Sequence, residues 1–242
     1  MYLFETADTI VEGVGFNYFD LTHIFWIVSF VLFAIVMSFI YKKSNPIRRK
    51  QIKKYMAMAI ILDEILKVVV LCIGGNYTVE YLPFHLCSIN IFIIAYHVYK
   101  PNKTLDNFLY AVCIPGALAA LLAPTWIELP ITSLMHLHSF TIHILLATYP
   151  IMLVVGGEIE PRIQEFPKCV LFTVLLAIPI YIFNLIFDTN FMFLMYAEAG
   201  NPLLLFEQLL GHHLLGVPII EGVVVAILYT PFHLYYKKKA RN

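Results

Sequence analysis

Charged residues are scarce in this chain: only 13% of its 242 residues are Asp, Glu, Lys or Arg, while 60% are hydrophobic. Soluble domains carry about 25% charged residues, so this chain has too few polar groups to cover a surface in water. We therefore exclude a soluble globular fold and expect an integral membrane protein. The formal net charge of zero gives no reason to expect a nucleic-acid partner.

Several chemical signatures are also absent. The four cysteines show no C-x-x-C spacing, so they predict neither a zinc site nor a disulfide framework. The chain has no G-x-S-x-G, H-E-x-x-H or P-loop motif, and we expect no cofactor and no metal. Residues 1–20 contain no Lys or Arg, so we expect no signal peptide and take the first apolar run as the insertion signal.

Seven apolar runs are long enough to cross a membrane. A bilayer core of about 30 Å needs roughly 20 apolar residues in a helix, and backbone groups in lipid must be paired within each segment. The runs are residues 21–41, 55–73, 82–99, 108–123, 136–155, 169–187 and 213–235. We predict an all-α bundle of seven transmembrane helices that forms a single integral membrane domain over residues 1–242.

The distribution of Lys and Arg predicts the orientation of this bundle. The first, third and fifth loops and the C-terminal tail hold every cation except Lys67, whereas the N-terminal segment and the other loops hold none. Cytoplasmic loops of membrane proteins are enriched in Lys and Arg. Seven helices put these cations on one side, while six or eight would divide them. We therefore expect the N-terminus outside and the C-terminus in the cytoplasm.

Polar residues within the expected helices concentrate in the outer half of the bundle. Ionisable groups in a bilayer are costly and indicate function by default. At a rise of 1.5 Å per residue, Cys87, Lys67, His143, Glu221 and Asp63 lie roughly 8 to 15 Å below the outer boundary. We expect a supporting polar site around them that also includes Asn90, His136, Ser139, Asn184 and Asn190.

Helical spacing sorts these residues by face. Cys87 and Asn90 share one side of the third helix, and Ser139 and His143 share one side of the fifth with His136. The same spacing directs two other histidines away from these faces, namely His85 and His138.

Each polar residue also has a purely structural interpretation. Asp63 and Lys67 stand four residues apart and could neutralise each other. Glu221 has no cation in its own helix, so we expect it to meet Lys67 or to share a hydrated cavity with it. His136 could be a solvated histidine at the interface, and Cys87 could be a small buried hydrophobe.

Cys87 and His143 have the chemistry of a nucleophile and its base. If folding brings them together, Cys87 attacks the ester carbonyl of an acyl lipid, and His143 takes the thiol proton and later activates the acceptor or water. Asn90 could orient the histidine or donate a hydrogen bond to the oxyanion.

Short motifs surround these residues in a fixed order. They are L-P-F-H-L-C at residues 82–87, P-G-A-L at 115–118, Phe140 with His143, and N-F-M-F-L at 190–194. Together they resemble the YwaF-like bacterial membrane proteins and the transmembrane protein 164 family with which these group. The resemblance implies an acyltransferase of the bacterial plasma membrane that acts on membrane phospholipids, with Cys87 as nucleophile and His143 as its partner. Ser88 departs from the pattern, because the family has an aspartate there.

Three classes of function remain open. The first is a lipid acyltransferase, or a lipid ester hydrolase of the same architecture, since the resemblance extends to androgen-induced-gene-type hydrolases that use threonine as nucleophile. The second is a small-molecule or proton-coupled transporter whose path is lined by Asp63, Glu64, Lys67 and Glu221. The third is a sensor or structural subunit without chemistry. The sequence does not predict the oligomeric state.

Overall fold

The structure is a computed structural model that describes residues 2–197 and 201–239, and every regular element in those ranges is a helix. The α-helices are α1 (Leu21–Lys43), α2 (Pro46–Gly74), α3 (Leu86–His97), α4 (Lys103–Phe108), α5 (Ile114–Leu122), α6 (Leu134–Val155), α7 (Phe166–Phe187), α8 (Leu203–Leu210) and α9 (Gly216–Lys239). A π-helical turn, Leu109–Cys113, joins α4 to α5 without a break. The predicted all-α class is confirmed.

Five helical segments are long and apolar enough to cross a membrane, which confirms a multi-pass helical membrane protein. They are Leu21–Lys43, Lys103–Leu122, Leu134–Val155, Ile163–Phe187 and His213–Leu234. The two other expected spans are helical as well. However, α3 is an apolar helix of only 12 residues, and α2 carries charged side chains along its 29 residues. The count of seven spans and the orientation therefore stay predictions.

Local sequence explains where the first two helices begin and end. Asp20 caps α1, because its carboxylate accepts hydrogen bonds from the backbone N–H groups of Asn17 and His23, both at 2.9 Å. These bonds hold the pKa of the Asp20 carboxyl below its usual value. Asn45 caps α2 in the same way. Gly75 ends α2 with a φ of 70°, in the left-handed region that glycine favours.

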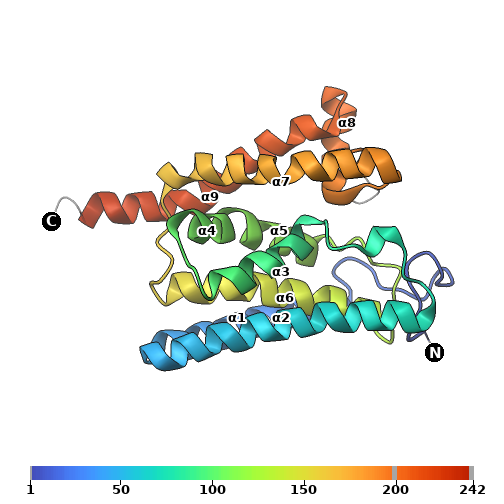
Figure 1. Cartoon of the computed structure of the whole chain (residues 1–242), viewed down its shortest axis with the longest axis horizontal. Coiled ribbons are helices and arrows are strands. Elements are labelled where there is room, and N and C mark those ends of the chain that lie inside the picture. The colour runs from blue at the N-terminus through green and yellow to red at the C-terminus, as the bar shows by residue number, and fades with distance from the viewer. Residues whose placement is uncertain (1, 198–200, 240–242) are drawn as a thin grey trace.

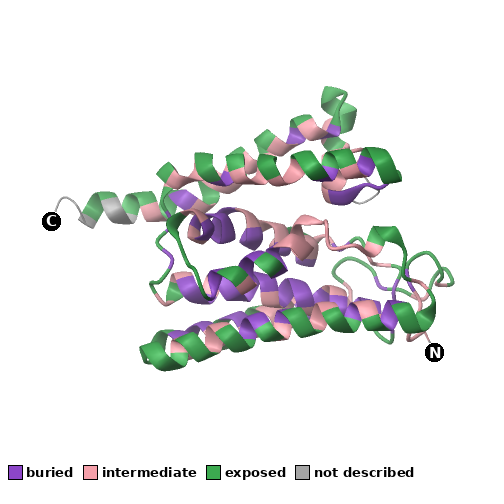
Figure 2. Cartoon of the chain, in the orientation of Figure 1, coloured by how far each residue is buried: buried purple, intermediate pink, exposed green. Residues whose placement is uncertain are grey.

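The helices form tiers around α6, which carries the largest set of buried side chains (Figures 1 and 2). α1, α2 and α5 contact α6, while α7 and α9 form an outer tier whose side chains are largely exposed. On α7 the exposed side chains are apolar, and they include Leu171, Val174, Leu175, Ile178, Ile182 and Leu185. Such a surface is stable in lipid but would be costly in water.

The loops gather into two groups at opposite ends of the bundle (Figure 1). The α1–α2, α3–α4 and α6–α7 connections lie at one end, together with the C-terminal end of α9. The N-terminal segment and the other connections lie at the opposite end. Every described Lys and Arg except Lys67 is in or beside the first group. We call that group the cationic end.

The N-terminal segment packs onto the loop between α5 and α6. The backbone N–H of Phe16 donates to the Ile127 carbonyl oxygen at 2.8 Å, and the Phe16 ring packs with Trp26 and Phe140. A Cβ atom on Gly15 would lie 2.0 Å from that same carbonyl oxygen. Glycine is therefore required at position 15 by close approach of two backbones.

Gly15→Ala should destabilise the fold by about 2 kcal/mol or more, because the added methyl group meets backbone rather than a flexible side chain. The expected result is a lower melting temperature of the purified protein in detergent, followed by intrinsic fluorescence. Gly222→Ala is the control, since a Cβ there meets nothing within 4 Å. Equal melting temperatures for the two variants would contradict this account.

Candidate functional site

A cavity of about 470 Å³ lies at the end of the bundle opposite to the cationic end. It is enclosed by α2, α3, α5 and α6, together with the chain that follows α7. Its polar lining residues are Glu64, His85, Cys87, Ser88, Thr125, His138, Ser139, His143 and Asn201. Cys87 and His143 thus line one cavity, although 55 residues lie between them in the sequence.

Small residues of α5 provide the space. Gly116, Ala119 and Ala120 recur at helical spacing and line the cavity, as does Ala123 at the end of the helix. Protein interiors are close-packed, so a void of this size requires such short side chains. Part of this stripe belongs to the P-G-A-L motif at 115–118.

Cys87 lies in the first turn of α3. The helix begins at Leu86, and the first backbone hydrogen bond along it runs from Ile89 N–H to the His85 carbonyl oxygen at 3.0 Å. The N–H groups of the first turn have no acceptor within the helix. The positive end of the helix dipole therefore lies beside the Cys87 sulfur.

His143 is held as a proton acceptor. Its Nδ1 lies 2.6 Å from the Ser139 carbonyl oxygen, which can only accept, so Nδ1 carries the proton. The lone pair of the neutral ring is then on Nε2. The Trp126 ring stacks on the imidazole at a centroid distance of 5.3 Å and an angle of 12°, which fixes its plane. This is the tautomer that a general base requires.

Two histidines that helical spacing directs away from the site in fact line the cavity. His85 is the residue before α3 and has extended backbone, so the rotation of 100° per residue does not apply to it. His138 lies on α6 beside Ser139, and the cavity face of that helix is centred between His138 and His143. The predicted directions of His85 and His138 are therefore wrong. The only sequence signal for His85 is its place in the L-P-F-H-L-C motif.

An ionic cluster on α2 and α6 contributes Glu64 and His138 to the lining of the cavity. Lys67 pairs with Glu64, one helical turn before it. His138 bridges the two helices, with Nδ1 at 3.2 Å from the Asp63 carboxylate and Nε2 at 3.8 Å from that of Glu64. The Thr141 hydroxyl lies 3.2 Å from both carboxylate oxygens of Asp63. Each charged group of this cluster thus lies beside a group of opposite charge or a polar group.

The expected pair of Lys67 and Glu221 is not formed. Lys67 is paired with Glu64 on its own helix, and Glu221 lies half-buried on α9, in the tier farthest from α2 (Figure 1). No ion pair joins Glu221 to another residue that the structure describes. The prediction rests on the similar depths of the two residues in the membrane, and depth does not determine which helices are neighbours.

Asn184 and Asn190 shape the chain that covers the cavity. The Asn184 amide donates to the Phe191 carbonyl oxygen and accepts from the Phe191 N–H, both at 3.0 Å. The Asn190 side-chain oxygen accepts from Met195 N–H at 3.1 Å. Between these anchors, Met192 adopts a φ of 58° and lines the cavity. Both asparagines therefore position the cavity wall from outside it.

His136 and Asn90 lie outside the cavity lining. Trp26 Nε1–H donates to His136 Nε2 at 2.9 Å, and His136 Nδ1–H donates to the Leu129 carbonyl oxygen at 2.8 Å. His136 therefore connects α1, α6 and the preceding loop. Asn90 is buried on α3, and its side-chain oxygen has no hydrogen-bond partner within the described ranges.

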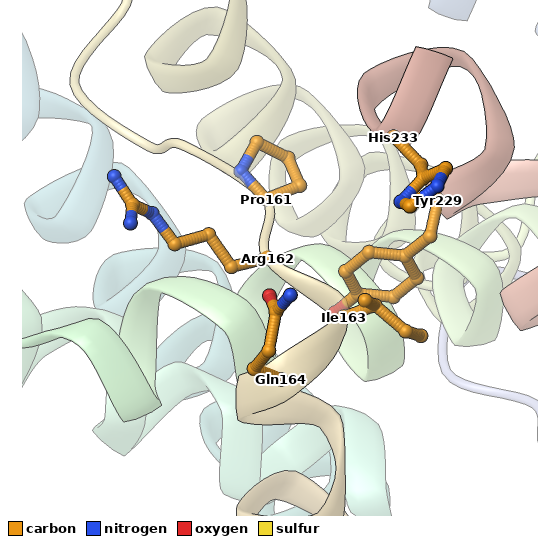
Figure 3. Close-up of a pocket in the computed structure, with 6 residues that line it drawn as sticks. All are labelled: Pro161, Arg162, Ile163, Gln164, Tyr229 and His233. Atoms are coloured by element: carbon orange, nitrogen blue, oxygen red, sulfur yellow. The ribbon is translucent and has the colours of Figure 1, made fainter. Parts of the chain in front are cut away.

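A smaller cavity of about 240 Å³ lies at the cationic end, between the α6–α7 connection and α9 (Figure 3). Tyr229 and His233 form one side of it, and Arg162 is directed away from them. It contains no cysteine, serine or threonine. Among the residues that the structure describes, no group of His, Cys, Asp and Glu could hold a metal ion. The cavity that Cys87 and His143 line is therefore the better candidate site.

The comparison with protein families agrees with the sequence motifs. The model of the TMEM164 family matches residues 18–232. The chain belongs to the TMEM164 family. The match includes every helix that lines the Cys87 cavity, so this cavity lies within the region typical of the TMEM164 family. The chain matches no curated protein and no solved structure.

Proposed function

We propose that this protein is a membrane-embedded lipid acyltransferase in which Cys87 is the nucleophile and His143 the base. The observation that carries the proposal is that both side chains line one cavity. The tautomer of His143, fixed by Ser139 and Trp126, leaves Nε2 free to accept the thiol proton. The family to which the chain belongs supports the membrane setting.

The reaction proceeds in two steps. The Cys87 sulfur attacks the ester carbonyl carbon of a phospholipid while His143 Nε2 takes the thiol proton. The ester C–O bond breaks, the proton passes to the leaving lysolipid oxygen, and an acyl thioester remains. In the second step an acceptor hydroxyl gives its proton to His143 and attacks the thioester. The C–S bond then breaks, and the proton returns to sulfur.

The first turn of α3 supplies stabilisation for the oxyanion. Unpaired backbone N–H groups at a helix N-terminus are suited to a developing negative charge, and they need no rearrangement during the reaction. Cys87 belongs to this turn. These groups fit the role better than Asn90, which does not line the cavity.

Water in place of the acceptor hydroxyl would make the same site a hydrolase. Both activities share the thioester, so they differ only in what reaches His143 in the second step. The transporter alternative receives less support, because Asp63, Glu64 and Lys67 are engaged with each other and with His138.

We further propose seven membrane spans, with α2 and α3 completing the five long apolar segments and with the cationic end in the cytoplasm. The cluster on α2 and α6 supports α2 as a span, because Lys67 pairs with Glu64 and Asp63 lies beside His138 and the Thr141 hydroxyl. Single cysteines at Glu12 and Lys238, both exposed, test this in a cysteine-free background. A membrane-impermeant maleimide should label Glu12→Cys in intact cells and Lys238→Cys only after permeabilisation. Labelling of both in intact cells would exclude an odd number of spans.

The acyl-enzyme itself is the direct test of the proposed function. After incubation with a phospholipid of known acyl composition, intact-protein mass spectrometry should show the protein plus one acyl group. Neutral hydroxylamine should remove it, since thioesters are cleaved under conditions that spare oxygen esters, and peptide mapping should locate it at Cys87. Acyl transfer that proceeds with no such adduct would refute the covalent mechanism.

A further inference from the structure

A third cavity, with a different chemistry, also lies at the cationic end. Its volume is about 540 Å³, and its lining includes Ser44, Arg49, Lys50, Lys53, Val98 and Glu158. These residues come from the α1–α2 turn, the start of α2, the end of α3 and the chain after α6. The cavity therefore lies at the far end of the same helices that form the Cys87 cavity, and it plays no part in the proposed acyl transfer.

Two of its three cations are held in place by the fold. The Arg49 guanidinium donates to the carbonyl oxygens of Tyr41, Ser44, Gly156 and Lys42 at 2.9 to 3.1 Å. It also lies 3.7 Å from the Glu158 carboxylate, and it retains N–H groups beyond the carbonyl contacts, because a guanidinium has five. Lys53 Nζ, on a side chain only 15% exposed, donates to Glu158 at 2.8 Å. Cations fixed in this way lose little conformational entropy when they bind an anion.

The third cation is free. Lys50 has an exposed side chain and makes no hydrogen bond or ion pair with any other described residue. Its ammonium group therefore has all its donors available on the cavity wall.

The Glu158 carboxylate does not neutralise the three cations of this cavity. Burial raises the pKa of its carboxyl, but hydrogen bonds from Lys53 and Tyr41 and the charge of Arg49 outweigh burial and lower the pKa. Glu158 is therefore ionised at neutral pH, and three cations face one carboxylate. The cavity keeps an excess of two positive charges, with Arg49 and Lys50 both offering unused donors.

We propose that this cavity binds the phosphate headgroup of an anionic phospholipid in the leaflet at the cationic end. Arg and Lys are the residues that recognise phosphate, and basic pockets between helices at a membrane surface bind anionic headgroups. A lipid, rather than a soluble phosphate, suits the position. The helices that carry the cavity expose apolar residues such as Phe39 and Ile47, against which acyl chains can lie.

Native mass spectrometry of the detergent-purified full chain tests the proposal, with dioleoylphosphatidylglycerol and dioleoylphosphatidylcholine as probes. Wild type should bind phosphatidylglycerol preferentially. Lys50→Gln should weaken that binding about fivefold, in keeping with the contribution of one Lys near an anionic surface. Because the Lys50 ammonium has no partner among the described residues, its loss should leave the melting temperature unchanged.

Lys54→Gln is the matched control. Lys54 is an exposed lysine one helical turn further along α2, and its ammonium lies over the Tyr99 ring, outside the cavity. The Lys54→Gln variant should bind phosphatidylglycerol as wild type does. Equal losses in both lysine variants, or no preference for phosphatidylglycerol in wild type, would overturn the proposal. So would competition by glycerol 3-phosphate at the same concentration as the lipid, which would identify a soluble phosphate as the ligand.

Discussion

Cys87→Ala should abolish acyl transfer, with a loss of about 10³-fold or more, because the covalent route through a thioester no longer exists. The substitution removes one sulfur atom from a half-buried side chain that lines a cavity, so the surrounding packing changes little. The melting temperature should therefore stay close to that of wild type. The measurement is the rate of transfer of a labelled acyl chain between lipids in reconstituted vesicles.

Two further variants separate chemistry from structure. Cys72→Ala is the control, since Cys72 is exposed on α2 and does not line the cavity, and its activity should be unchanged. Cys87→Ser retains a weaker nucleophile and should form an oxygen ester that resists hydroxylamine. If Cys87→Ala transfers acyl chains at the wild-type rate, Cys87 is a packing residue and the proposed function is wrong.

The helical segments could be predicted from the sequence because lipid imposes a simple rule. Backbone groups must be paired within each segment, so every long apolar run becomes a helix. The residues at which the helices begin and end are harder to predict from the sequence. The apolar pattern predicts that the third span begins at residue 82, but α3 begins at Leu86, since His85 has extended backbone. Because His85 lies before the helix, helical spacing predicts the wrong direction for its side chain.

Depth in the membrane and the sequence motifs favour a pairing of Cys87 with His143, and the structure brings both side chains to one cavity. The same depth reasoning failed for Lys67 and Glu221. The position of a residue along its helix determines its depth in the membrane. Its neighbours depend on how the helices pack, and α2 packs against α3 and α6. A charged residue also finds partners on its own helix, as Lys67 does with Glu64.

The backbone conformation of the chain after α7 could not be predicted from the sequence, although the N-F-M-F-L motif at 190–194 lies in it. Met192 and Phe193 both have a positive φ, which residues other than glycine rarely adopt. They keep this conformation because Asn184 and Asn190 hold the chain on both sides. Backbone strain of this kind is set by the hydrogen bonds of individual side chains and leaves no periodic pattern in the sequence.

His143→Asn should lower the rate of acyl transfer by about 10²- to 10⁴-fold, the range that loss of a general base produces. Asparagine is the informative replacement because its amide nitrogen can take the place of Nδ1 and donate to the Ser139 carbonyl oxygen, as the imidazole does at 2.6 Å. The nitrogen that accepts the thiol proton, Nε2, is lost. Formation of the thioester should slow together with its transfer to the acceptor, since His143 moves the proton in both steps.

Added imidazole distinguishes a lost base from a damaged cavity. A small base that enters the space vacated by the ring should restore part of the activity of His143→Asn, more so as the pH rises and more of the imidazole is neutral. It should not help Cys87→Ala. His233→Asn is the matched control, because His233 is exposed on α9 at the cationic end, and its activity should equal that of wild type. Wild-type activity in His143→Asn would mean that another group activates Cys87, and His85 and His138, which line the same cavity, would be the residues to replace next.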